Sequence, residues 1–299
     1  MNKSSDRAPF QLLETKGWED YRLLDSGDGR RLEQVGGHVI SRPEPQAIWH
    51  PRLPASDWSK AEAAYHQEGT KGHWEFTGEP LERWETGYQS VRFWTRLGAF
   101  HHLGHFPEQT LHWDWMLERL AGKPGANVMN LFAYSGVATL LAARAGASVV
   151  HVDASRHAIT WARENAELSG LDGSPIRWIC EDARKFVERE VRRGNRYDGI
   201  LLDPPKFGRG PKKEVWELFD HLPDLLRGCR DLLSEDGGFV VLTAYAIRAS
   251  AVSLHELARE VFADGTTEIS FGELCVVEQD GDRRVPTSMF CRIDFRPNP

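Results

Sequence analysis

Three aspartates follow three short apolar segments of this 299-residue chain. Asp153 comes after residues 148–152, Asp182 after 176–180 and Asp203 after 197–202, and helix-like segments separate the three. Alternating strands and helices predict a parallel sheet, which binds ligands beyond the carboxyl ends of its strands. We therefore expect the three carboxylates to line one rim, with Asp153 on a ribose, Asp182 near an adenine amine and Asp203 where chemistry takes place.

The loop before the first of these aspartates indicates which nucleoside is bound. Residues 127–132 predict a buried strand, residues 137–145 predict a helix, and Gly146 suits the helix C-terminus. A dinucleotide site needs several glycines for its pyrophosphate, whereas this loop has only Gly136, which argues against NAD. S-adenosylmethionine carries a ribose and an adenine without phosphate. We expect it to contact the loop residues Phe132, Ala133, Tyr134, Ser135 and Gly136.

The sequence Asp203-Pro204-Pro205-Lys206-Phe207 is the most specific signal in the chain. Two prolines fix φ near −65° and keep the backbone extended, so the carbonyls of Asp203 and Pro204 should point outward as rigid acceptors. Such acceptors can orient an amine toward a methyl donor, and Phe207 could stack on a flat base. The alternatives are an ordinary proline turn here and, for Asp182, a helix N-cap, although one carboxylate could serve both roles.

The order of elements predicts an α/β fold in two parts. Residues 1–105 contain hairpin-like and proline-rich segments and predict a small β-rich domain, with a turn at residues 25–29. Residues 106–299 predict a Rossmann-like sheet of seven strands that ends in an antiparallel hairpin. Eight of the 11 tryptophans lie at or before Trp115; we favour a core role for them over base stacking.

Local signals also predict helix boundaries. Pro107 suits the first turn of one helix, Ser155 can N-cap a helix that ends at Ser169, and residues 214–233 predict another helix.

Composition excludes several classes of protein. No apolar run approaches a membrane span of about 20 residues, and residues 1–11 do not form a signal peptide, so we expect a cytoplasmic protein.

The net charge of −7 does not predict nucleic-acid binding, but basic clusters occur at residues 184–196 and 206–213, of which the second lies nearer the predicted site. The histidines at 101, 102 and 105 have no partners at metal-ligand spacing, so no metal is expected.

Several motifs in sequence order carry a resemblance to a known family. These are FAYSG, VDAS, ENAELSGL, EDARKFV, LLDPPKFGRG and LLSEDGGFVVLT. Together they resemble the class I S-adenosylmethionine-dependent methyltransferases, in particular the bacterial 23S ribosomal RNA cytosine-5 and guanine-7 methyltransferase group. The resemblance implies that the FAYSG loop, Asp153, Asp182 and Asp203 meet the cofactor, with Ala154, Ser155 and Ala183 beside them, and that Pro204, Pro205 and Phe207 face an acceptor, expected to be ribosomal RNA.

The cysteines restrict the chemistry. Methylation of carbon 5 of a pyrimidine requires a cysteine thiolate that adds to the ring. Related cytosine-5 enzymes have a cysteine after the fifth strand, where this chain reads Thr243-Ala244-Tyr245, and only Cys180 precedes a predicted site residue closely. We therefore expect direct transfer to a base nitrogen, with an oxygen as the second choice, and no covalent enzyme–substrate adduct. A small-molecule or protein N-methyltransferase, or a non-catalytic cofactor-binding assembly factor, remains an alternative, although the intact DPPKF motif disfavours the last.

Overall fold

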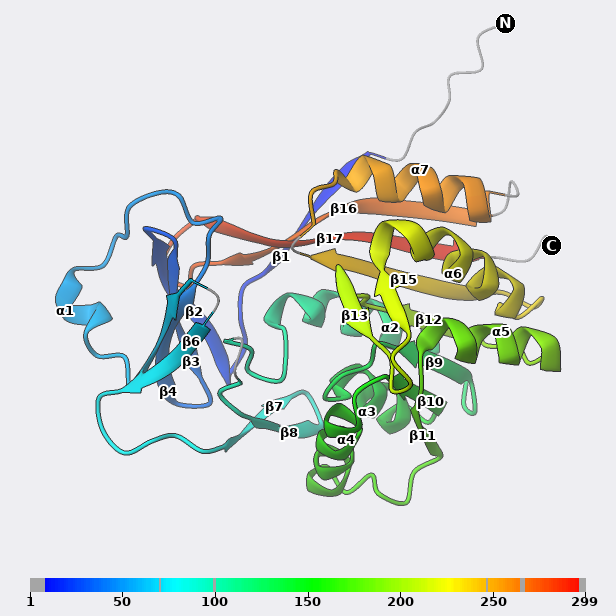
Figure 1. Cartoon of the computed structure of the whole chain (residues 1–299), viewed down its shortest axis with the longest axis horizontal. Helices are drawn as coiled ribbons and strands as arrows, with labels where there is room; N and C mark the ends of the chain where they lie inside the picture. The colour runs from blue at the N-terminus through cyan, green and yellow to red at the C-terminus, as the bar shows by residue number, and fades with distance from the viewer. Residues whose placement is uncertain (1–8, 70, 99–100, 246, 264–266, 296–299) are drawn as a thin grey trace, which may run out of the picture.

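A computed structural model describes residues 9–69, 71–98, 101–245, 247–263 and 267–295. Its largest element is an eight-stranded sheet (Figure 1). The strands, in spatial order, are β1 (Phe10–Thr15), β16 (Thr267–Val277), β17 (Arg284–Phe295), β15 (Gly238–Tyr245), β12 (Gly199–Leu202), β9 (Asn127–Leu131), β10 (Ser148–Asp153) and β11 (Ile176–Cys180).

The seven expected strands and their directions are confirmed. The five strands from β15 to β11 run parallel, and β17 is antiparallel to both β15 and β16. A parallel sheet must be covered on both faces, because its strands are apolar on both sides. One face is covered by α5 (Ala183–Arg193), α6 (Leu218–Leu232) and α7 (Ala251–Phe262), which pack together. The other face is covered by α2 (Thr110–Leu120), α3 (Val137–Arg144) and α4 (Arg156–Leu168). The short helix η1 (Pro107–Gln109) leads into α2.

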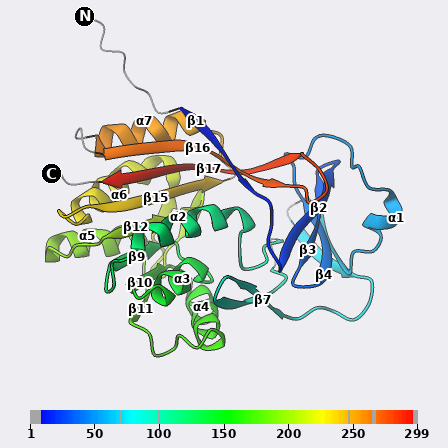
Figure 2. The same ribbon diagram turned by 180° about the vertical axis from the view of Figure 1, so that it is seen from behind.

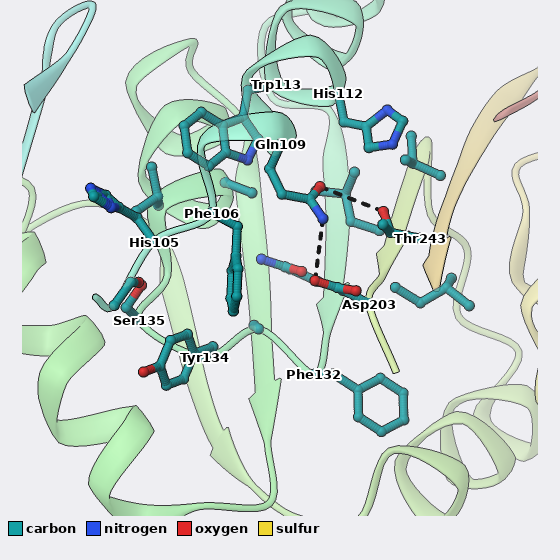
Figure 3. Close-up of a pocket in the computed structure, with 18 residues that line it drawn as sticks. His105, Phe106, Gln109, His112, Trp113, Phe132, Tyr134, Ser135, Asp203 and Thr243 are labelled. Atoms are coloured by element: carbon teal, nitrogen blue, oxygen red, sulfur yellow. Dashed lines mark hydrogen bonds between the residues drawn. The ribbon is translucent and has the colours of Figure 1, made fainter. Parts of the chain in front are cut away.

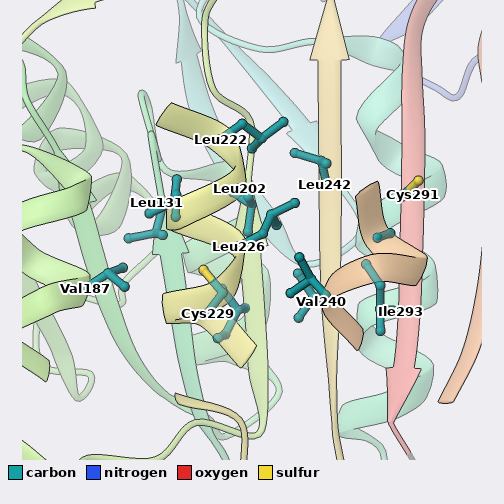
Figure 4. Packing of buried hydrophobic residues seen from close by; sticks show 14 of the residues in the cluster. Leu131, Val187, Leu202, Leu222, Leu226, Cys229, Val240, Leu242, Cys291 and Ile293 are labelled. Carbon is teal, nitrogen blue, oxygen red and sulfur yellow. The ribbon is translucent and has the colours of Figure 1, made fainter. Parts of the chain in front are cut away.

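Alternation along the central strands builds two hydrophobic cores, because successive side chains of a strand point to opposite faces. In β12, Ile200 and Leu202 pack with α5, α6 and α7, whereas Leu201 packs with α2 and α3. Figure 4 shows the first of these cores, in which Leu222 and Leu226 of α6 contact the strands. Both faces of the sheet are therefore fixed, and the strand ends are held in a defined register.

The N-terminal part forms a separate β-rich module, as predicted. Its five-stranded sheet has the order β2 (Tyr21–Gly27), β3 (Arg30–Val35), β4 (His38–Pro43), β5 (Ala63–Glu68) and β6 (Lys71–Phe76), and a ribbon of β7 (Trp84–Tyr88) and β8 (Val91–Thr95) follows. The expected turn is confirmed at Asp28 and Gly29, whereas residues 25–27 of the predicted turn belong to β2 and pair with β3. Residues 44–54 are irregular, as their prolines predict, and precede the short helix α1 (Ala55–Trp58).

The tryptophans serve mainly as core, which confirms the favoured interpretation. The side chains of the eight tryptophans up to Trp115 are buried or half-buried. Several satisfy the indole N–H with an internal acceptor: Trp18 donates to the Gly87 carbonyl, Trp74 to Gly98 and Trp84 to Val35, over 2.7–2.9 Å. A small module thus buries large rings without leaving their polar atoms unpaired.

Strand β1 was not expected in the large sheet. It pairs in parallel with β16, although the two are more than 250 residues apart in sequence (Figure 2). The approach depends on Gly272, since a Cβ at this position would lie 1.7 Å from the Gln11 carbonyl oxygen. A second unexpected element is a small hairpin of β13 (Phe207–Arg209) and β14 (Val215–Glu217). Strand β14 replaces the start of the helix predicted over residues 214–233, so α6 begins only at Leu218. We call this hairpin the flap.

Candidate functional site

The loop between β9 and α3 has an unusual backbone. Phe132, Tyr134 and Gly136 have φ values of 55°, 49° and 84°, in the left-handed region that residues other than glycine rarely adopt. Such conformations are retained mainly where function requires them. A Cβ on Gly136 would also lie 2.9 Å from the Ala162 methyl group, so both the positive φ and the lack of space favour glycine at this position. The hydroxyl of Ser135 donates to the Gly104 carbonyl and anchors the loop.

Asp153 secures this loop from the neighbouring strand. Its two carboxylate oxygens accept hydrogen bonds from the backbone N–H groups of Tyr134 and Ser155, over 2.9 and 2.8 Å. Burial raises the pKa of Asp153 above its ordinary value, although both hydrogen bonds act in the opposite direction. Ser155 in turn caps α4, as predicted, by accepting from the Ala158 N–H. Each carboxylate oxygen keeps a lone pair for a ligand hydroxyl.

Asp182 is the N-cap of α5. Its Oδ1 accepts from the N–H groups of Arg184 and Lys185, and the residue is 4% exposed. The helix-capping alternative for this residue is therefore confirmed. The described hydrogen bonds of this carboxylate involve Oδ1, so Oδ2 is free to accept from a ligand amine.

Both carboxylates border one cavity of about 280 Å³, which we call the cofactor cavity. The rings of Phe132 and Tyr134 and the small side chain of Ala183 supply apolar wall, and Asp153 and Asp182 supply acceptors. Other predicted residues that border it are Ala154, Ser155, Asp203 and Pro205. The flap lies along its side, with Gly208, Arg209, Gly210 and Trp216 in contact with the same space.

Asp203 stands at the junction with a second, smaller space of about 80 Å³, the inner cavity, shown in Figure 3. Its Oδ2 accepts from Gln109 Nε2 over 3.2 Å, while its buried Oδ1 has no hydrogen-bond partner. Gln109 Oε1 accepts from the Thr243 hydroxyl, so the amide is fixed from both sides. Burial and the nearby charge of Glu108 raise the pKa of Asp203 to about 8. Ala133 and Ser135 also border the inner cavity.

The remaining residues of the DPPKF turn lie in different environments. Pro204 is buried, and the Pro205 carbonyl accepts from Trp216 Nε1 over 2.7 Å. Trp216 also packs on Phe132, with ring centroids 4.9 Å apart, so the flap joins the turn to the cofactor loop. Phe207 is 52% exposed on the flap. Gly136, Pro204 and Phe207 are not among the residues that border the cofactor or inner cavity.

Several residues at the site were missed by sequence reasoning. Phe106 and Gln109 come from the segment that leads into α2, Trp216 comes from the flap, and Tyr245 ends β15. The helix start at Pro107 was recognised from sequence, but nothing in the local pattern placed it over the strand ends. Trp216 had a signal, since a tryptophan among charged residues beside the DPPKF motif is a candidate for ring packing.

These residues fit S-adenosylmethionine. The apolar walls and the Asp182 carboxylate suit an adenine, and Asp153 suits a ribose. The buried Asp203 Oδ1, which lacks a partner, suits a donor or a positive charge, and the cofactor has both an ammonium and a sulfonium. In the described part of the chain, no group of three or more histidine, cysteine or acidic side chains could hold a metal ion. No helix among the described residues is long and apolar enough to cross a membrane.

Comparison with known proteins agrees with this geometry. Residues 59–268 match the family model described as S-adenosylmethionine-dependent methyltransferase. The crystal structure of the SAM dependent methyltransferase from Agrobacterium tumefaciens superposes with a TM-score of 0.93 and 47% identity, over 97% of this chain and 96% of that one.

Curated relatives include ribosomal RNA methyltransferases. Ribosomal RNA large subunit methyltransferase K of Neisseria meningitidis is 27% identical over 71% of this chain and 62% of that protein. Methyltransferase K/L of Syntrophotalea carbinolica is 35% identical over 52% of this chain and 22% of that protein. The chain thus spans less than two thirds of the length of these relatives. The family match, the structural likeness over nearly the whole chain and the strand-end site agree: the chain belongs to the S-adenosylmethionine-dependent methyltransferases.

Proposed function

We propose that the protein methylates RNA, with ribosomal RNA as the substrate, by direct transfer of a methyl group from S-adenosylmethionine to a base nitrogen. The observation that carries the proposal is the set of unpartnered acceptors at the end of β12. Asp203 Oδ1 is buried without a hydrogen-bond partner, and no donor among the described residues bonds the backbone carbonyl oxygen of Asp203. These oxygens can hold the N–H groups of an acceptor amine.

The proposed mechanism gives the cofactor and the site residues separate roles. The cofactor, held by the 132–136 loop, Asp153 and Asp182, supplies an electrophilic methyl group. Asp203 orients the attacking nitrogen, and this orientation accounts for most of the rate in such a transfer. Gln109 fixes the Asp203 side chain, and Trp216 fixes the Pro205 carbonyl. The proton released from the nitrogen passes to solvent or to the Asp203 carboxylate, depending on pH.

The cysteines favour nitrogen over carbon 5 as the acceptor. Cys229, Cys275 and Cys291 are buried, and burial raises the pKa of each thiol. Cys180 is exposed, and its Sγ lies 3.7 Å from the Ala154 carbonyl, at the nucleoside end of the cofactor cavity. None of the four borders the cofactor or inner cavity, so none is placed to add to a pyrimidine ring.

Charge near the site favours a nucleic acid over a small molecule. The basic cluster on and after α5 is largely neutralised, since Arg189 pairs with Glu181, Lys185 with Glu214 and Arg193 with Glu190. In contrast, no ion pair is found within the described chain for four cations on and beside the flap: Lys206, Arg209, Lys212 and Lys213. Unpaired cations around a cavity are suited to phosphates.

Labelled methyl transfer tests the proposal. The purified protein is incubated with methyl-labelled S-adenosylmethionine and with RNA, protein or metabolite fractions from a strain that lacks the gene. We expect label in ribosomal RNA, on a nitrogen of a base after digestion to nucleosides. Label confined to the protein or metabolite fraction would instead support the small-molecule or protein N-methyltransferase alternative.

A further inference from the structure

A third cavity, of about 410 Å³, lies between the β-rich module and the last strands of the large sheet. The module contributes Arg31, Arg42 and Glu44, and the sheet contributes Tyr245 and Ser288. The cavity adjoins the cofactor cavity, because His102, Phe106 and Tyr245 border both. Its volume is within the range of small-ligand pockets. We call it the interdomain pocket.

The wall between the two cavities is aromatic. The rings of Phe106 and Tyr245 lie with centroids 6.0 Å apart at an interplanar angle of 35°. Tyr245 and Asp203 both border the cofactor cavity, so Tyr245 stands close to the reaction centre. Burial raises the pKa of the Tyr245 hydroxyl, and the charges of Asp203 and Glu108 add to this effect. Flat rings at the border of a pocket are the usual stacking partners of an unpaired nucleobase.

The polar groups of the pocket lack sufficient partners within the protein. Glu108, at 7% exposure, accepts from its own backbone N–H but from no other residue among those described. Burial raises its pKa, although the charge of Arg31 acts in the opposite direction. Ser288 is also 7% exposed, and its hydroxyl is buried with no partner. Arg31 Nε lies 3.4 Å from Glu33 but makes no hydrogen bond. Buried groups left in this state are costly unless a ligand completes them.

The balance of charge identifies the class of ligand. Acidic side chains in the pocket (Glu44, Glu108 and Glu273) outnumber the arginines Arg31 and Arg42, and Arg42 is already bonded to Glu33. A phosphate is therefore disfavoured. A carboxylate and a hydroxyl on the wall of one pocket suit a neutral ring with an exocyclic amine. The amine can donate to Glu108, while Ser288 or Arg31 donates to a ring acceptor.

We propose that the interdomain pocket receives the acceptor as a flipped-out nucleobase with an exocyclic amine, and that Glu108 and Ser288 recognise it. This proposal rests on the proposed RNA methylation. The base stacks on Phe106 and Tyr245, with its reactive edge toward Asp203 and the cofactor cavity. The β-rich module then forms one wall of the substrate site, which assigns it a role in choosing the base.

The test compares Glu108→Gln and Ser288→Ala with the wild type and with Glu188→Gln, an exposed glutamate on α5. Each protein is assayed for kcat/KM on total RNA from a strain lacking the gene. Affinity for S-adenosylhomocysteine is measured by calorimetry, because this product lacks the sulfonium charge of the cofactor and therefore responds less to the loss of the Glu108 charge. Labelled RNA is digested to nucleosides to identify the modified base.

We expect Glu108→Gln to lower kcat/KM by about 10- to 100-fold and Ser288→Ala by about 2- to 10-fold, with product affinity unchanged. Glu188→Gln should resemble the wild type. Unchanged kcat/KM in both pocket variants, or label on uridine, would overturn the pocket proposal while leaving RNA methylation intact. Failure of the wild type to label any RNA would overturn both proposals.

Discussion

Asp203 keeps a proton at neutral pH that an ordinary aspartate loses, because its carboxylate is buried beside Glu108 and its pKa is raised to about 8. A raised folded-state pKa gives a stability contribution that is fully present below the unfolded value of about 3.9 and is lost as pH rises through about 8. Between these two pKa values, each unit by which the pH rises should lower the free energy of unfolding by about 1.4 kcal/mol through Asp203.

Asp203→Asn, which cannot titrate, removes this slope. Urea denaturation of the cofactor-free protein at pH 5, 6 and 7 should therefore show the wild type losing stability relative to Asp203→Asn as pH rises. The same comparison with exposed Asp224→Asn provides a control for the general effect of pH. Parallel profiles for the wild type and Asp203→Asn would mean that Asp203 titrates normally.

Asp153 should contribute directly to cofactor affinity. Asp153→Ala removes the proposed charge-assisted hydrogen bond to the ribose and frees the Tyr134 N–H. We expect a loss of about 1.5–3 kcal/mol, or roughly 10- to 100-fold in the Kd for S-adenosylmethionine by calorimetry. Asp153→Asn keeps one carbonyl acceptor and should lose less. Binding of NAD in preference to S-adenosylmethionine would contradict this assignment of the site.

At the scale of elements, the flap places one exposed ring beside the site. Phe207 and Val215 lie on facing strands of the flap, at 52% and 44% exposure. If Phe207 stacks on an RNA base, Phe207→Ala should raise the KM for RNA by about 5-fold or more, since such stacking contributes about 1–3 kcal/mol. Product affinity and thermal stability should not change.

Val215→Ala is the matched control for this prediction, because it shortens a comparably exposed apolar side chain on the same hairpin. It should leave the KM for RNA near that of the wild type. Equal effects of the two substitutions would indicate that the flap itself was disturbed. A loss of cofactor affinity in Phe207→Ala would place this ring at the cofactor cavity instead.

At the scale of the whole molecule, the chain ends tie the two parts together. β1 leaves the large sheet and leads into the β-rich module, while the turn between β16 and β17 reaches back to it. There, Ser26 Oγ donates to Glu278 Oε1, and the Gln279 N–H donates to the Leu23 carbonyl. These contacts hold the module in place as a wall of the interdomain pocket.

The pairing of β1 can be tested at Gly272. A methyl group there overlaps the Gln11 carbonyl, so Gly272→Ala should separate β1 from β16 and cost about 1–3 kcal/mol of stability. Limited proteolysis should then cut the chain before Tyr21 sooner. Gly173→Ala, where a Cβ has open space, is the control. Identical proteolysis of the two variants would show that β1 pairing tolerates the extra atom.

The sequence by itself determined the order of elements and the cofactor end of the site. Alternating apolar segments, the single-glycine loop and the strand-end aspartates are local signals. Parallel topology is sufficient to bring Asp153, Asp182 and Asp203 to one edge. The cap at Ser155 and the turn between β2 and β3 were predicted for the same reason, since each depends on neighbouring residues.

Only the tertiary structure decided which distant residues complete the site. Gln109 and Asp203 are 94 residues apart, and their contact depends on how α2 packs across the strand ends. The pairing of β1 with β16 depends on an approach allowed by one glycine, and Phe207 lies on a hairpin whose second strand, β14, formed where the start of a helix was predicted. The burial of Glu108 and the unpartnered hydroxyl of Ser288 are also invisible in the sequence, because burial is a property of the assembled fold.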